Sequence, residues 1–282
     1  MFPRAVDQHK PNKPLIPNGL GVIYVLVSTV YLFLLHYYNY AAALPLAGCI
    51  LFGGFMGLLD DWLDLRWRYK AFLPLFASLP LAVQREALGP EATKMATYIF
   101  GRIDFGPLFY IIVIPVIVTV TTNVVNQLGG MNGLETICPS IVMIGLMATS
   151  PQKSILLILP LLVYLILSVF NFSGKIFVGN TGSFAAGLTL ASYAIIANNE
   201  QTLLISISPF IFNSSLILLN VFLYGRTARL ILSGQRWRAD SRRSLLTLIA
   251  NYKPLTERAL VAVASLLVAL STLIAVLVCY AW

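Results

Sequence analysis

The sequence predicts an all-α fold, a polytopic bundle of membrane-spanning helices. Of its 282 residues, 58% are hydrophobic and only 11% are charged, whereas soluble domains average about 45–50% apolar and about 25% charged residues. The mean hydropathy is +0.82, and the apolar runs are unbroken, unlike the alternating strands of a membrane barrel. This composition excludes soluble enzymes, disordered chains and nucleic-acid binders. The net charge of +8 therefore indicates membrane orientation and not a nucleic-acid partner.

Apolar runs bounded by proline, glycine or charge predict nine spans in a single domain over 1–282. They are 20–38, 42–59, 71–84, 107–125, 134–150, 154–170, 183–198, 202–224 and 258–280. The first is similar to a signal peptide, but its length and the eight later spans favour a retained helix. The third is short and contains Pro74 and Pro80, so it is the least regular. The outer loop 85–106 contains Ile99–Phe105, which predicts a small hairpin.

Basic residues predict the orientation, with the N-terminus inside and the C-terminus outside. With that topology, 15 of the 19 Lys and Arg residues lie in cytoplasmic segments, and four lie outside, namely Arg85, Lys94, Arg102 and Lys153. Cytoplasmic loops of membrane proteins carry this excess of positive charge. The longest cytoplasmic segments are then 1–19, 60–70, 171–182 and 225–257.

Three of only eleven acidic residues, Asp60, Asp61 and Asp64, lie together at the end of the second span. Residues three or four apart share a helix face, so the spacing predicts that the three carboxylates crowd one sector. A helix C-terminus disfavours negative charge by about 0.3–1 kcal/mol, which indicates a compensating cation or substrate. The alternative is a solvated cluster at the membrane surface, paired with the basic residues of 66–70.

A second polar stretch, T-N-V-V-N-Q-L-G-G-M-N-G-L-E, covers residues 122–135. It places Asn123 and Asn126 at the cytoplasmic end of the fourth span, and Asn132 just before the fifth. A helix cap and a turn explain this composition, because Asn and Gly tolerate left-handed backbone. Amide oxygens and glycines also suit cation ligation and close approach of the backbone to a ligand. Both interpretations stay open.

The third polar stretch, F-V-G-N-T-G-S-F-A-A-G, covers residues 177–187 before the seventh span. Asn180, Thr181 or Ser183 can cap that helix. A helix N-terminus behind a glycine-rich turn is also a site for anions. All three polar stretches converge on the cytoplasmic face, which favours a substrate site there.

Taken in order, these motifs resemble the polyprenyl-phosphate N-acetylhexosamine-1-phosphate transferases. The matching patterns are D-D-x-x-D followed by Lys, N-x-x-N-x-x-x-G-x-N-G, and F-V-G-x-x-G-S. The stretches L-R-W-R-Y-K-A-F-L-P and M-N-G-L-E are most similar to the dolichyl-phosphate GlcNAc-1-phosphotransferase branch. The opening D-x-x-K-P-N-K-P-L-I-P-N-G-L-G is similar to the loop before that family's second helix. The resemblance covers about residues 7–225.

The resemblance implies transfer of GlcNAc-1-phosphate, or a related HexNAc-1-phosphate, from a UDP-sugar to a polyprenyl or dolichyl phosphate, with release of UMP. It implies Mg²⁺ or Mn²⁺ as the cofactor. It also implies an endoplasmic-reticulum or prokaryotic cell membrane, with the active site facing the cytoplasm. Membrane lipid surrounds such a protein, and a homodimer or a scaffold partner is a further expectation.

By position, the resemblance assigns catalytic roles to Asp60 and Asp61, which organise the cation and the lipid phosphate, and to Lys70, which contacts phosphate. The metal positions are Asn126 and Asn180, Gly130 and Asn132 contact uracil, and Phe177 stacks on it. Asp64 stands where the family often has Asn. Together with Asn123, Arg236 and Arg238, which the family pattern does not assign, it is a candidate for substrate binding.

Three departures from the family pattern matter. Asn180 stands where the family has a metal-binding aspartate, so the negative charge that holds Mg²⁺ is lost. The first of the usual ten spans is expected to be absent. The last cytoplasmic loop, G-Q-R-W-R-A-D-S-R-R, lacks the family's His-containing sugar motif, and its arginines either substitute for that motif or bind anionic lipid headgroups.

Two other functions compete with transfer. A non-catalytic homologue would bind nucleotide sugar or lipid phosphate, or support an active partner, and Asn180 favours it. A transporter would carry an ion on carboxylates within broken helices. Against transport, the acidic residues cluster at the cytoplasmic edge of the spans and not at the bilayer centre.

Overall fold

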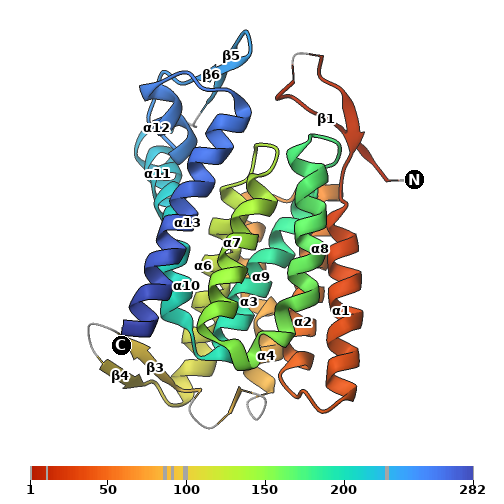
Figure 1. Ribbon diagram of the computed structural model, residues 1–282, viewed down its shortest axis with the longest axis vertical. Coiled ribbons are helices and arrows are strands. Elements are labelled where there is room, and N and C mark those ends of the chain that lie inside the picture. Colours follow the sequence, from red (N-terminus) through yellow and green to blue (C-terminus); the bar gives the residue numbers. More distant parts are fainter. Residues whose placement is uncertain are drawn as a thin grey trace.

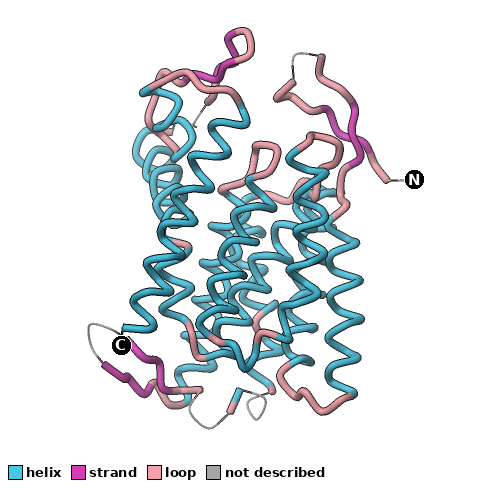
Figure 2. Tube along the Cα trace, viewed as in Figure 1, coloured by secondary structure: helices cyan, strands magenta, loops and turns pink. Residues whose placement is uncertain are grey.

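A computed structural model (Figure 1) describes residues 2–10, 12–84, 88–89, 92–97, 101–225 and 229–281. Long helices run side by side, and two-stranded hairpins lie at both ends of the bundle (Figure 2). The helices are α1 (Gly21–Tyr37), α2 (Ala43–Leu63), α3 (Trp67–Ala77), α4 (Leu79–Val83), α6 (Ile114–Gln127), α7 (Leu134–Thr149), α8 (Ile155–Phe172), α9 (Gly179–Ala197), α10 (Glu200–Ser206), α11 (Ser208–Tyr224), α12 (Leu245–Tyr252) and α13 (Glu257–Ala281). A π-helical turn, Phe109–Val113, leads into α6, and a 3₁₀ turn, Pro151–Lys153, precedes α8. The predicted all-α class is confirmed.

Helix occupies each of the nine predicted apolar segments. Four helical stretches are long and apolar enough to cross a membrane on their own, namely α2, 109–127, α8 and α13. The pair α10 and α11 counts as a fifth, although it bends by 59°. The third segment is two helices, α3 and α4, which meet at Ser78. The chain is therefore an integral membrane protein.

Helix α9 forms the centre of the bundle, with all of its residues from Thr181 to Ile196 buried. It packs on α2 across two glycines four residues apart, Gly53 and Gly57. A Cβ at Gly57 would lie 2.2 Å from the carbonyl oxygen of Asn180, so any side chain there would force the helices apart. Small residues at this spacing let membrane helices approach closely. The contact holds the end of α2 against the beginning of α9.

Three antiparallel hairpins lie within the described residues. Strand β1 (Arg4–Val6) pairs with β2 (Leu15–Pro17), and β5 (Ile231–Ser233) pairs with β6 (Arg236–Arg238), both at one end of the bundle. At the other end, β3 (Lys94–Thr97) pairs with β4 (Gly101–Asp104). The predicted outer loop thus contains a hairpin, but its first strand precedes the predicted range of 99–105, and residues 98–100 lie outside the described part of the chain.

Several helix limits differ from the sequence prediction: α2 ends at Leu63 and not at residue 59, and α3 begins at Trp67 and not at residue 71. Helix α9 begins at Gly179, four residues before the predicted start, because its cap comes from another helix. Helix α12 lies inside the segment 225–257, which was predicted only as a polar loop. Its N-terminus carries a capping box between Ser244 and Thr247, and because Glu or Gln usually takes the second position, the sequence gives little sign of it.

The two ends of the chain lie at opposite ends of the bundle (Figure 1), as an odd number of crossings requires. The side that faces the cytoplasm stays a prediction from the basic residues, of which Arg85 and Arg226 lie outside the described residues. A reporter fused at the C-terminal end should be found outside, and one inserted near Ser233 in β5 should be found inside. Reporters that both label the same side would contradict the nine-span topology.

Candidate active site

The last turn of α2 presents a buried carboxylate paired with a lysine. Asp60 is 3% exposed, and its Oδ1 lies 2.8 Å from Nζ of Lys70 in α3. The same oxygen accepts a hydrogen bond from the backbone N–H of Leu65. Asp64 ends the helix in left-handed backbone, with φ 45°, and its exposed carboxylate lies 3.8 Å from the same lysine. Oδ2 of Asp60 is buried without a hydrogen-bond partner, so this pair keeps a free anionic acceptor.

Asp61 points away from this pair and caps α9. Its Oδ1 accepts from the backbone N–H of Asn180 at 2.8 Å, and its Oδ2 accepts from the backbone N–H and the hydroxyl of Thr181 at 3.0 and 2.7 Å. A carboxylate at a helix N-terminus also gains about 0.3–1 kcal/mol from the helix dipole. The prediction that all three aspartates share one sector is therefore wrong for Asp61, because adjacent helical residues differ by about 100° in direction.

The two predicted metal positions lie in direct contact. Nδ2 of Asn126 in α6 donates to Oδ1 of Asn180 at 3.0 Å and to Oγ of Ser183 at 2.8 Å. The amide oxygen that Asn180 would offer to a cation therefore already accepts a hydrogen bond. An amide pair occupies the position where a carboxylate would face Asn126.

These residues fit a divalent cation incompletely. Mg²⁺ in proteins is held by one or two carboxylates together with water and substrate phosphates. Across the described ranges, no three His, Cys, Asp or Glu residues gather in a way that could hold a metal ion. Both carboxylate oxygens of Asp61 accept hydrogen bonds from α9, whereas Asp60 has one oxygen without a hydrogen-bond partner. A cation here would depend mainly on Asp60 and on the substrates' own phosphates.

The predicted uracil residues lie in the loops at the same end of the bundle. Gly130 is exposed, with φ 104° and open space where a Cβ would stand, and its N–H donates to Oε1 of Glu135. Asn132 is 4% exposed, and its backbone N–H donates to Oε1 of Glu257 at 3.1 Å. Phe177 is half-buried, and its N–H donates to the carbonyl of Pro17 at the end of β2. The N-terminal hairpin and α13 therefore position this region.

The two arginines proposed for the sugar lie on one face of β6. Arg236 and Arg238 are exposed, whereas Trp237 between them is 7% exposed. Trp237 packs 5.6 Å from the His9 ring and bonds with Leu255 through both backbone groups. The structure joins Trp237 to the polar end of the bundle and directs both arginines outward.

A groove of about 670 Å³ runs between α3, α6 and α11. Its polar wall comes from α3 and the C-terminal half of α6, with Lys70, Asn123, Asn126 and Gln127. The α11 wall is mainly apolar, including Ile211, Leu218 and Phe222, and the Phe222 ring lies 6.2 Å from that of Trp67. A long apolar molecule with a charged head matches this lining.

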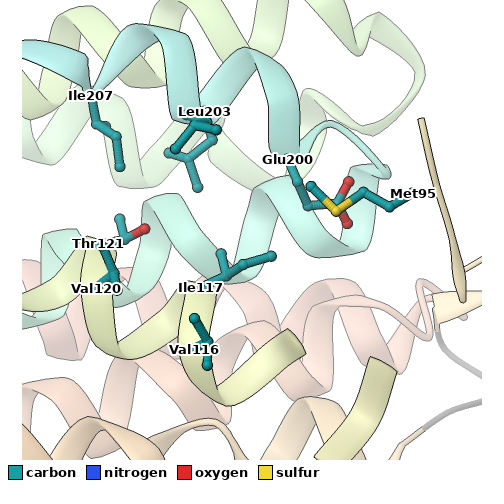
Figure 3. Close-up of a pocket in the computed structure, with 9 residues that line it drawn as sticks. Met95, Val116, Ile117, Val120, Thr121, Glu200, Leu203 and Ile207 are labelled. Atoms are coloured by element: carbon teal, nitrogen blue, oxygen red, sulfur yellow. The ribbon is translucent and has the colours of Figure 1, made fainter. Parts of the chain in front are cut away.

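A smaller cavity of about 200 Å³ lies between α6 and α10 (Figure 3). Its lining is apolar except for Thr121 and the buried carboxylate of Glu200, beside Met95 of β3. None of the residues that the motifs single out lines it. The candidate active site is therefore the groove and the polar end around Lys70.

Several residues that contact the predicted site at this end of the bundle were not assigned a role from the sequence. Asp7 and Glu257 hold Asn132, and Glu135 holds Gly130. Asp7 and Glu135 lie within the quoted motifs, but only tertiary contacts show their roles. Glu257 belongs to no motif and carries no local sign.

The bundle and its polar end define a polytopic membrane protein with a lipid-sized groove leading to a lysine–carboxylate pair. Residues 43–198 match glycosyl transferase family 4. The chain belongs to this family, and the resemblance inferred from its motifs is confirmed.

Relatives of this chain are consistent with that family. A protein of Saccharolobus solfataricus is 32% identical over 218 residues, covering 73% of this chain and 66% of that protein. Its name assigns it provisionally as a UDP-N-acetylglucosamine–dolichyl-phosphate N-acetylglucosaminephosphotransferase. A Dictyostelium discoideum protein of that name is 30% identical, over 70% of this chain and 59% of its own. A phospho-N-acetylmuramoyl-pentapeptide-transferase of Streptococcus uberis is 27% identical, over 82% and 74%. The chain thus spans slightly less than two thirds of its archaeal relative.

Proposed function

We propose that this protein transfers HexNAc-1-phosphate, with GlcNAc as the first candidate sugar, from a UDP-sugar to a polyprenyl or dolichyl phosphate. The observation that carries the proposal is Lys70, which lines the apolar groove and pairs with the buried carboxylate of Asp60. The groove accepts the prenyl chain, and the ammonium group meets the phosphate at its head. We further propose that this end faces the cytoplasm, where the basic segments lie.

The reaction is an exchange at phosphorus. An oxygen of the lipid phosphate attacks the sugar-bearing phosphorus of the UDP-sugar, forming a new P–O–P bond. The bond from that phosphorus to the oxygen of UMP breaks, and UMP leaves with the electron pair. The attacking phosphate has a second pKa of about 6, so it is mainly dianionic at neutral pH and needs little help from a base. Asp60 and Asp61 then serve first to organise the site.

The residues of this chain lower the repulsion between the two phosphorylated substrates. Lys70 places a positive charge where the two substrates meet. In phosphoryl transfer, fixed charges at the reacting phosphates stabilise the transition state and provide most of the rate acceleration. Bound Mg²⁺ or Mn²⁺ would supply further charge neutralisation. Asp60 and the substrates' phosphates would hold it, with Asn126 beside them, and Asn180 would add its amide oxygen only once the hydrogen bond from Asn126 is broken. Gly130, Asn132 and Phe177 bind the uridine, and Arg236 and Arg238 approach the sugar or the lipid headgroups.

A direct assay tests the proposal. The purified protein in lipid nanodiscs is incubated with labelled UDP-GlcNAc, dolichyl phosphate and Mg²⁺, and UMP and the lipid-linked product are measured together. Stoichiometric appearance of both supports transfer. Release of UMP without a lipid product would show hydrolysis, and contradicts the proposed acceptor.

A second candidate is a homologue that binds these substrates without catalysis. The hydrogen bond between Asn126 and Asn180 favours it, because a neutral amide replaces the carboxylate expected there. Such a protein would bind uridine nucleotides, turn over no substrate, and support a partner or a second copy. The transporter hypothesis has less support, since the acidic groups of the site lie at the end of the bundle.

Uridine nucleotides should raise the melting temperature, because a ligand that binds the folded state stabilises it by mass action, whereas adenosine nucleotides should not. Phe177→Ala should weaken the shift, since stacking of a base on an aromatic ring is worth about 1–3 kcal/mol. Equal shifts for UDP and ADP would indicate a general anion site and no uridine pocket.

A further inference from the structure

The N-terminal hairpin directs a buried carboxylate at the loop between α6 and α7. Asp7, which follows β1, has no exposed surface. Its Oδ2 accepts a hydrogen bond of 3.0 Å from Nδ2 of Asn132 and lies 3.5 Å from Nζ of Lys10. Its Oδ1 accepts from the backbone N–H of His9 at 3.0 Å. Contacts within the hairpin therefore fix the carboxylate, which in turn holds one side chain of the opposite loop.

This contact determines which way the Asn132 amide points. A carboxylate only accepts hydrogen bonds, so Asn132 must turn its NH₂ group toward Asp7. Its Oδ1 then faces the other way, where it is buried without a hydrogen-bond partner. Buried acceptors that lack a donor are rare in folded proteins. The Asn132 oxygen is an acceptor oriented in advance for a donor from outside the chain.

Room for such a donor lies two residues away. Gly130 is exposed, and no heavy atom of a neighbour would come within 4 Å of a Cβ there. The Lys10 side chain beside Asp7 is 35% exposed, and its ammonium group donates a hydrogen bond of 2.9 Å to the carbonyl of Gly174. The Asn132 oxygen itself is buried, so a flat ring that approaches from the Gly130 side has to displace neighbouring atoms to reach it.

We propose that Asp7 sets the base specificity of the nucleotide site by fixing the orientation of Asn132, an inference that rests on the proposed function. The N3 position of uracil carries a hydrogen and donates to the waiting oxygen. The N3 position of cytosine is an acceptor and would face that oxygen with no hydrogen between them. Turning the amide over to suit cytosine would place its oxygen against the Asp7 carboxylate. Asp7 is thus a positioning residue that favours uracil.

Binding of UMP and CMP tests this by titration calorimetry on the full-length protein. The unaltered protein should prefer UMP, and Asp7→Asn should lower the UMP-to-CMP affinity ratio by about tenfold or more, because an amide partner permits either orientation of Asn132. Asp7→Glu, which keeps the carboxylate, should retain the preference. Asn132→Ala combined with Asp7→Asn should show the same ratio as Asn132→Ala alone.

Glu257→Gln is the matched control. Glu257 holds the backbone N–H of Asn132 and not its side chain, so this change should leave the ratio of the two affinities unaltered even where both affinities fall. An unchanged ratio in Asp7→Asn, or an equal drop in Glu257→Gln, overturns the assignment.

A measurement on the unaltered protein covers the case in which the Asp7 variants do not fold. UMP methylated at N3 lacks the donor and should bind at least tenfold more weakly than UMP, and equal binding of the two would also overturn the assignment. Absence of any uridine-nucleotide binding by the unaltered protein would refute the proposed nucleotide site itself, an outcome distinct from loss of base preference alone.

Discussion

Lys70→Ala should lower the rate of sugar-phosphate transfer by about 100- to 1,000-fold, the usual cost of removing one group that stabilises transition-state charge. Two polyanions meet at this site, and the Lys70 ammonium lies at the head of the groove. The measurement is initial-rate formation of the lipid-linked product in nanodiscs. Binding of UMP should persist, because Asn132 and Phe177 lie in other loops.

Loss of Lys70 also leaves the buried Asp60 carboxylate without its partner at 2.8 Å, so the variant needs a control for stability. Asp60→Asn combined with Lys70→Met removes both charges and should fold while staying inactive. Arg102→Ala changes an exposed basic residue in β4 at the other end and should leave the rate unchanged. Equal losses in Lys70→Ala and Arg102→Ala would show that the site is placed at the wrong end.

Asn180→Asp should raise Mg²⁺-dependent transfer at least about tenfold, which corresponds to about 1.4 kcal/mol of transition-state stabilisation. The new carboxylate would keep the hydrogen bond from Asn126 and add the anionic oxygen that a hard cation prefers. The fold should tolerate the change, because the two side chains are nearly identical in shape. The measurement is a Mg²⁺ titration of the rate for both proteins in one membrane preparation.

A second measurement separates metal binding from turnover. The new carboxylate at position 180 would lie near that of Asp61, which accepts a hydrogen bond from the backbone N–H of residue 180. Mg²⁺ should therefore raise the melting temperature of the Asn180→Asp variant more than that of the unaltered protein. Asn180→Ala should gain neither activity nor Mg²⁺ response. Full activity with Asn180 and no gain with Asp would refute this metal position. Inactivity of both forms, despite uridine-nucleotide binding, would favour the non-catalytic homologue.

Apolar runs were enough to predict the helices, because burial in a bilayer imposes long unbroken hydrophobic segments. The predicted starts were less accurate where distant groups decide them. The N–H groups that open α9 are satisfied by Asp61 of α2, and nothing near Gly179 reveals this. Pro74 and Pro80 marked the third segment as irregular, yet they did not reveal its division into α3 and α4 at Ser78.

The candidate site, like the fold, was predicted only in part from the sequence. Motifs identified Lys70, Asp60 and the paired amides Asn126 and Asn180, and the structure brings them to one end of the bundle. Motif letters alone did not show that Asp60 and Asp61 face different helices, or that Asp7 holds Asn132 from a hairpin 125 residues away in the sequence. Such contacts depend on tertiary packing, and a single sequence shows only local spacing. The roles assigned to these residues stay predictions.

The cap that Asp61 provides for α9 also determines when the polar end of the protein can assemble during synthesis. The hydrogen bond to Asn180 joins positions 119 residues apart, so α2 leaves the ribosome well before its partner helix is synthesised. Until then the Asp61 carboxylate has no helix end to hold, and Gly53 and Gly57 have no surface to pack on. The polar end is therefore assembled late, after the ribosome has produced α9. A chain released before that point would hold inserted helices without the site.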